Sequence, residues 1–141
     1  MKKGRILCLD VGEKRIGIAI SDPDMSIAFP HKVLNRTSLE KDLRAISDVI
    51  EEKKAVKLVV GHPISLSGGK SQQTLLVEEF TEEIKKEIGI ETILWDERLS
   101  TSEADKSLSS MGTESRKRRG KIDEIAASLI LQNYLDKNRD G

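Results

Sequence analysis

The sequence predicts an α/β fold with a mixed five-stranded sheet flanked by helices. Three observations support this class. Three short apolar segments follow one another closely, two more alternate with amphipathic stretches, and 141 residues are the length of one domain. Strands joined by short links pair antiparallel, whereas strands joined through a helix pair parallel. We therefore expect one domain over residues 1–141 whose sheet mixes both pairings.

The first half of the chain contains an expected antiparallel meander followed by a helix. The strands cover residues 5–10, 15–21 and 27–34. Pro30 marks the third strand as an edge, because proline cannot donate to a strand ladder. Thr37 and Glu40 form a capping-box pattern that begins the helix. Its apolar residues recur at helical spacing and are Leu39, Leu43, Ile46 and Ile50.

The second half adds two expected strands and three expected helices. The strands cover residues 56–60 and 91–95. Between them lies a helix that ends near Gly89, with an apolar stripe of Leu76, Phe80, Ile84 and Ile88. Ser100 and Glu103 begin a short helix that stops near Gly112. A long helix follows over about residues 122–137, and the tail after about residue 136 is expected to fray.

Composition excludes several classes of protein. The single cysteine, Cys8, rules out an internal disulfide framework and a cysteine-rich zinc site. No apolar run approaches the ~20 residues of a membrane span, so we expect a cytoplasmic protein. The 24 basic and 24 acidic residues cancel, which argues mildly against nucleic acid. However, basic residues are concentrated at 116–121, which is either a solvated loop or a phosphate-binding segment.

Four acidic residues lie where a site is expected. Asp10 ends the first strand, Asp96 and Glu97 end the fifth, and Asp123 shares a helical stripe with buried-type residues that include Ala127. Neighbouring carboxylates repel by about 4 kcal/mol at ~4 Å and an effective dielectric near 20, so a cluster needs protons or cations. Oxygen ligands favour Mg²⁺ or Mn²⁺, and two such ions promote phosphodiester cleavage.

Each of these residues also has a purely structural interpretation. Asp10 can cap a turn, and Asp123 can cap a helix or complement its dipole. Strand alternation places Asp96 and Glu97 on opposite faces, so one of them reaches a metal, and the sequence does not decide which. His62 before proline is either a general base or a structural residue.

The loop at residues 61–73 is not a Walker A phosphate loop. Gly69, Lys70 and Ser71 resemble the end of that motif, but Ile64 stands where its first glycine must be. Exposed backbone amides in the loop can still contact a phosphate.

Four motifs share their spacing with a known family. They are Leu9-Asp10-Val11-Gly12-x-Lys14-Arg15-x-Gly17-x-Ala19-x-Ser21-Asp22, Val60-Gly61-x-Pro63 with Gly68-Gly69, Asp96-Glu97-Arg98-Leu99-Ser100-Thr101, and Lys121-x-Asp123-x-x-Ala126-Ala127. Over about residues 5–135 the chain resembles the YqgF family, also called RuvX-like. The resemblance implies a ribonuclease H-like fold related to the RuvC-type Holliday-junction resolvases.

The resemblance also implies an activity and its residues. We expect a metal-dependent endonuclease that holds Mg²⁺ or Mn²⁺ through Asp10, Asp123 and either Glu97 or Asp96. Its first expected substrate is the 5′ end of the precursor of 16S ribosomal RNA, and a four-way DNA junction is second. The expected nucleic-acid-binding residues are Lys14, Arg15, Arg98, Ser100, Thr101, Arg116, Lys117, Arg118, Arg119 and Lys121. Ribosome-assembly components are further expected partners, and the expected state is a monomer or weak homodimer.

Two other classes of function compete with the nuclease. The Asp10–Gly17 segment resembles the phosphate loop of actin- and hexokinase-like proteins, but those proteins clamp nucleotide between two such domains and this chain supplies one. A non-catalytic ribosome-assembly or transcription factor would use the fold only to bind RNA. The intact acidic set argues against that class.

Overall fold

The sheet is mixed, as the link lengths predict. A computed structural model describes residues 4–64, 68–96 and 119–138, with the backbone alone in 119–124. Five strands form one sheet in the order β3-β2-β1-β4-β5. They are β1 (Arg5–Val11), β2 (Arg15–Ser21), β3 (Ala28–Asn35), β4 (Ala55–His62) and β5 (Thr92–Asp96). The first three pair antiparallel, whereas β4 and β5 run parallel to β1, which confirms the α/β prediction.

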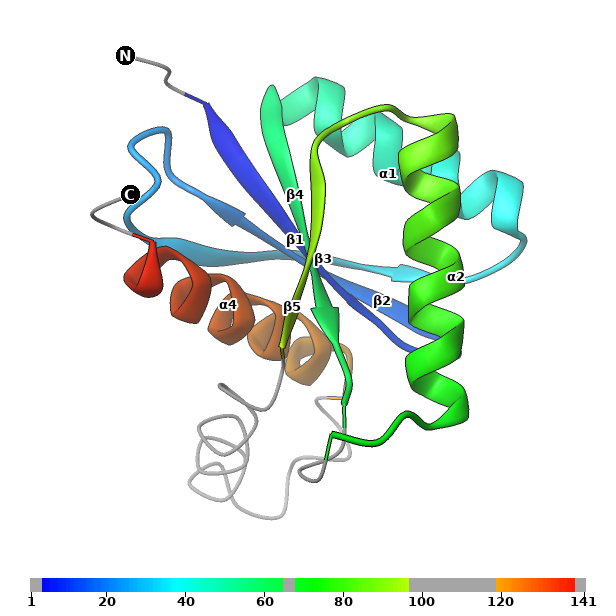
Figure 1. Cartoon of the computed structure of the whole chain (residues 1–141). Coiled ribbons are helices and arrows are strands. Elements are labelled where there is room, and N and C mark those ends of the chain that lie inside the picture. Colours follow the sequence, from blue (N-terminus) through cyan, green and yellow to red (C-terminus); the bar gives the residue numbers. More distant parts are fainter. Residues whose placement is uncertain (1–3, 65–67, 97–118, 139–141) are drawn as a thin grey trace.

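Helices cover both faces of the sheet, which explains why its strands are apolar on both sides (Figure 1). The helices α1 (Leu39–Lys53) and α2 (Gln72–Glu87) cover one face, which is called the α1/α2 face. The helix α4 (Arg119–Lys137) covers the other, which is called the α4 face. Alternation along β1 sends Leu7 and Leu9 into the core under α1 and α2. Ile6 and Cys8 enter the core under α4, so Cys8 is a small core residue. None of these described helices is long and apolar enough to cross a membrane.

The helix ends refine the expected boundaries. The N-cap of α1 is Ser38, whose side chain accepts from the amide of Lys41, so the prediction of Thr37 is wrong by one residue. Ser71 caps α2 in a reciprocal capping box with Thr74. Gly89 follows that helix with a φ of 78°, a conformation that favours glycine and confirms the predicted stop. The expected short helix after Ser100 lies outside the described residues.

β3 is an edge strand, as Pro30 predicts. Its pairing with β2 is interrupted by a register shift, because Lys32 pairs with Ile18 while Pro30 pairs with Ala19. A bulge and a proline both weaken an edge as a template for further strands. In the strand order, β1 is the centre of the sheet, with two strands on each side.

Candidate active site

Asp10 lies near the end of the central strand, at an edge shared by three strands. Leu9 of β1 pairs with Val60 of β4, which pairs with Leu94 of β5. Because these strands are parallel, their carboxyl ends meet at the same edge of the sheet. Asp10 follows Ile6 and Cys8 in strand alternation, so it lies on the α4 face, where it is half-buried.

α4 runs so that its beginning lies toward Asp10. Its last turns meet the start of β1, where Tyr134 and Leu135 line a pocket with Ile6. At 1.5 Å per residue, position 123 lies about 16 Å nearer the start of α4 than Tyr134 does. Asp10 lies about 13 Å along β1 from Ile6, so both positions lie a similar distance from the contact between Tyr134 and the start of β1. Position 123 also precedes the fully buried Ala127 by one helical turn, on the same stripe. The side chain of Asp123 lies outside the described residues.

The orientation of Trp95 fixes the side on which Asp96 lies. The Trp95 indole Nε1 donates to the Asn133 side-chain oxygen of α4 at 2.9 Å. Its ring also meets Tyr134 edge-on, with 5.1 Å between ring centroids. Trp95 is therefore on the α4 face, and alternation puts Asp96 on the α1/α2 face, opposite Asp10. Glu97 lies outside the described residues.

The turn that follows Asp10 carries two of the predicted phosphate-binding residues. Lys14 is exposed and Arg15 is half-buried. The amide of Gly12 donates to the Arg15 carbonyl at 2.8 Å, and a Cβ at position 12 would lie 2.9 Å from that oxygen. The turn therefore requires glycine at position 12. The other predicted binding side chains lie outside the described part of the chain, namely Arg98, Ser100, Thr101, Arg116, Lys117, Arg118, Arg119 and Lys121.

Comparison with known proteins identifies the family. A family described as "RuvX: Holliday junction resolvase" matches residues 4–137. The chain belongs to the RuvX family. It is therefore an enzyme of the nuclease type, a hydrolase.

Curated relatives and solved structures agree with this RuvX membership. A protein of Desulforudis audaxviator is 40% identical over 137 residues, which cover 97% of each chain. One of Carboxydothermus hydrogenoformans is 43% identical over 132 residues, covering 94% of this chain and 96% of that relative. Both are named "Putative pre-16S rRNA nuclease". Thermus thermophilus RuvC in complex with a Holliday junction substrate matches with a TM-score of 0.58 and 9% identity over 96% of each chain, which shows the ribonuclease H-like fold.

In this RuvX chain, His62 belongs to an ion-pair network on the side opposite Asp10. Its Nε2 lies 2.7 Å from the Glu78 carboxylate of α2, and the Lys70 ammonium lies 3.0 Å from the same oxygen. The hydrogen bond from His62, followed by that from Lys70, lowers the pKa of Glu78. Within Gly69-Lys70-Ser71, the segment that resembles the end of a Walker A motif, Lys70 therefore pairs with Glu78 and Ser71 caps α2. The network joins the end of β4 to α2.

Glu78→Gln tests this network through its pH dependence. Because the folded-state pKa of Glu78 is lowered, its stabilisation is present above the ordinary glutamate pKa of about 4.3. It is lost as pH falls through the folded-state pKa. We expect wild type to unfold at higher urea than the variant at pH 7, and the gap to close in acid. Urea midpoints from pH 7 down to pH 3 measure this, with the exposed neighbour variant Glu79→Gln as the control. A gap that is constant across this range contradicts the assignment.

Sequence reasoning missed a second network, which holds the turn after Asp10. Asp42 is only 5% exposed although it lies on an α-helix, and it pairs with Arg36 at 3.2 Å. A buried carboxylate requires a partner. An aspartate directly beside the apolar stripe of α1 was therefore the sequence signal that could have revealed this pair. Arg36 itself follows β3 in a polar link without periodicity, and no sequence pattern marks it.

Proposed function

We propose that this RuvX-family nuclease is a divalent-metal-dependent endonuclease that cleaves phosphodiester bonds in structured nucleic acid. The observation that carries the proposal is the placement of Asp10. This carboxylate sits at the carboxyl end of the central strand, on the face covered by α4, next to a turn with an exposed lysine. A half-buried acid beside a cationic turn is suited to a metal ion on one side and a phosphate on the other.

The donor set of the proposed site fits Mg²⁺ or Mn²⁺. Asp10, Asp123 and Glu97 would hold the ions, since carboxylate oxygens are the ligands that these hard cations prefer. The direction of α4 supports Asp123, because its earlier turns lie toward the end of β1. A two-ion site would supply an activated water and stabilise the charge of the leaving oxygen. Among the described residues, no group of three or more metal-ligating side chains occurs, and Glu97 and the Asp123 side chain are not among them.

The chain's cationic residues have a separate task, which is to hold the nucleic-acid backbone. Lys14 is exposed at the turn after Asp10, and Arg15 follows it. We assign phosphate contacts to both, together with Arg98, Ser100, Thr101 and the basic segment of residues 116–121. Such contacts fix the register of the substrate without reading its sequence. The zero net charge of the whole chain does not oppose such contacts, because the local arrangement of charges governs phosphate binding more than their sum does.

The proposed substrate is the 5′ end of the precursor of 16S ribosomal RNA. The names of the curated relatives support this choice. On this proposal the enzyme works in the cytoplasm, beside ribosome-assembly components. The second candidate is a four-way DNA junction, favoured by the family description and by the fold shared with RuvC. Paired cleavage of a two-fold junction requires a dimer, so a monomeric state at assay concentration counts against it.

Cleavage of matched substrates tests the proposal. Wild-type protein is incubated with end-labelled precursor rRNA and with a labelled four-way junction, each in Mg²⁺, Mn²⁺ or EDTA. We expect site-specific cleavage of the RNA with either metal and none in EDTA. Cleavage of the junction alone would reassign the substrate to DNA, and binding of RNA without cleavage under any metal would support an assembly factor instead.

The salt dependence of binding tests the assignment of the cationic residues. With about five phosphates contacted, affinity for RNA should fall roughly 10²- to 10³-fold between 50 and 200 mM salt. Fluorescence anisotropy in EDTA measures binding without cleavage. Lys14→Gln should weaken binding and make this dependence shallower, whereas Lys41→Gln, an exposed lysine of α1, should do neither. Equal salt dependence in both variants would remove Lys14 from the interface.

A further inference from the structure

The turn between β1 and β2 is anchored by side chains from outside the hairpin. The Val11 carbonyl accepts from the Gln73 side-chain amide of α2 at 2.6 Å. The next carbonyl, that of Gly12, accepts from the Arg36 guanidinium at 3.0 Å. The amide of Arg36 donates to the Lys14 carbonyl at 2.9 Å. Side chains on the α1/α2 side of the sheet therefore hold two of these three carbonyls, and a backbone amide that follows β3 holds the third.

Arg36 is itself held in one orientation. Its Nε donates to an Asp42 oxygen at 3.2 Å, and the other Asp42 oxygen accepts from the amide of Thr37 at 3.1 Å. The guanidinium also stacks over the Phe80 ring of α2, 4.9 Å from its centroid. The side chains of Arg36 and Asp42 are 18% and 6% exposed. Any other rotamer of Arg36 would leave the buried Asp42 carboxylate without this charged partner, which favours the observed orientation.

The anchored turn connects the two sides of the sheet. Asp10, which directly precedes it, lies on the α4 face, whereas Arg36, Asp42 and Gln73 act from the opposite face. Arg36 therefore does not reach the proposed substrate. It acts on the backbone that sets the direction of Asp10 and of the exposed Lys14.

We propose that Arg36, oriented by Asp42, is a positioning residue for the turn that joins Asp10 to Lys14. This inference rests on the proposed nuclease function for its effect on catalysis. Its effect on the backbone of the turn is independent of that function. Arginine is required because its planar fork donates to Asp42 and to the Gly12 carbonyl at the same time, and lysine cannot span both.

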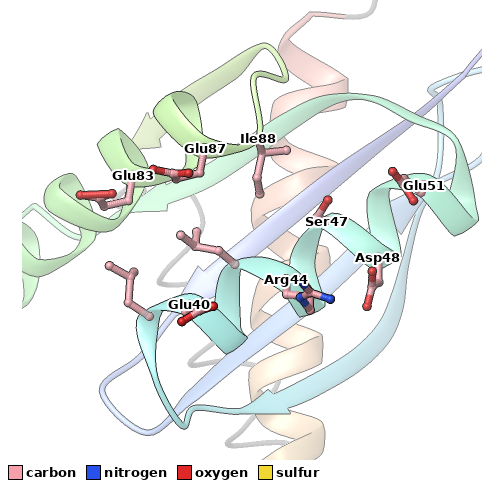
Figure 2. Close-up of a pocket in the computed structure, with 10 residues that line it drawn as sticks. Glu40, Arg44, Ser47, Asp48, Glu51, Glu83, Glu87 and Ile88 are labelled. Atoms are coloured by element: carbon pink, nitrogen blue, oxygen red, sulfur yellow. The ribbon is translucent and has the colours of Figure 1, made fainter.

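Arg36→Lys tests the proposal, with two controls on α1. Arg44→Lys makes the same change at an exposed position of α1 (Figure 2), and Val49→Ala lowers stability from a buried position in the α1/α2 core. In Arg36→Lys we expect kcat on precursor rRNA to fall about 10- to 100-fold, the loss that misplacement by an ångström produces. KM should change less than kcat, because Lys14 is the one assigned phosphate-binding residue that lies within the anchored turn and the others are left in place. Arg44→Lys should match wild type.

Amide hydrogen exchange gives a second readout that needs no cleavage. The Gly12 amide, bonded to the Arg15 carbonyl, should exchange about 10-fold faster in Arg36→Lys than in Val49→Ala at matched global stability, as expected for one lost charge-assisted hydrogen bond. Equal exchange in the two variants would overturn the anchoring role. Faster exchange with unchanged kcat would overturn the positioning role. If wild type cleaves nothing, the proposed function fails, and exchange at Gly12 still decides whether Arg36 orders the turn.

Discussion

Asp10→Asn and Asp123→Asn should each lower the rate of RNA cleavage by about 10³-fold, because each removes a charged ligand of the proposed metal ions, which would stabilise the transition state by several kcal/mol. Asparagine has nearly the shape of aspartate, so the central strand and the start of α4 should fold as before. Single-turnover cleavage of labelled precursor rRNA with saturating Mg²⁺ measures the effect. Binding of the same RNA in EDTA should persist, since the cationic residues are unchanged.

A matched control separates this result from a general loss of charge. Asp48→Asn makes the same substitution at an exposed position of α1, on the far side of the sheet, and should cleave at the wild-type rate. Thermal unfolding without metal should show Asp10→Asn no less stable than wild type, because the substitution relieves repulsion among the proposed carboxylates. Full cleavage by both Asp10→Asn and Asp123→Asn would refute the proposed site.

The second large effect should distinguish two adjacent acids. We expect Glu97→Gln to lose about 10²-fold or more in cleavage rate, as removal of a proposed metal ligand predicts, and Asp96→Asn to stay within about threefold of wild type. The reason lies in strand β5. Trp95 packs against α4, so Asp96 lies on the α1/α2 face, in register with His62 and away from Asp10. By elimination, Glu97 is the acid proposed to complete the set.

The pair of variants is its own control, because both exchange a carboxylate for an amide at neighbouring positions. A titration of activity against Mn²⁺ concentration adds a readout specific to metal binding. Glu97→Gln should require more metal for half-maximal rate, while Asp96→Asn should follow the wild-type curve. A larger loss in Asp96→Asn than in Glu97→Gln would reverse the assignment.

Most of the fold was predictable because it depends on local rules. Short links required an antiparallel meander, helical links required parallel strands, and Pro30 marked the edge strand. The family was predictable for the same kind of reason, since four motifs with fixed spacing carry more information than any one of them. The structure confirms the sheet, and the family match confirms the resemblance.

The sequence did not predict which residues of strand β5 face α4 and which face the opposite helices, and physical chemistry explains why. Its residues Ile93, Leu94 and Trp95 are all apolar because helices cover both faces of the sheet. A continuous apolar run contains no alternation between polar and apolar residues, so it does not show whether Trp95 or its neighbours Leu94 and Asp96 face α4. The contact between Trp95 and Asn133 resolves the orientation, and it joins residues far apart in the sequence.

The cap of α1 shows how tertiary contacts override a local pattern. Thr37 and Glu40 match a capping box, yet the amide of Thr37 donates to Asp42 and Ser38 becomes the cap. The same aspartate also pairs with Arg36, outside the four residues of the capping-box pattern. A four-residue capping-box pattern cannot predict a contact of this kind, because Arg36 and Asp42 both lie outside it.

The position of α4 in the chain has a consequence for synthesis. This helix is made after every strand that it covers, and chains emerge from the ribosome in order from the amino end. Until α4 docks, Ile6, Cys8 and Ala19 have no cover, and the proposed site lacks Asp123. If Asp123 is a ligand of the proposed site, a nascent chain cannot complete that site before α4 has been made, so cleavage should begin only after the helix has docked on the sheet.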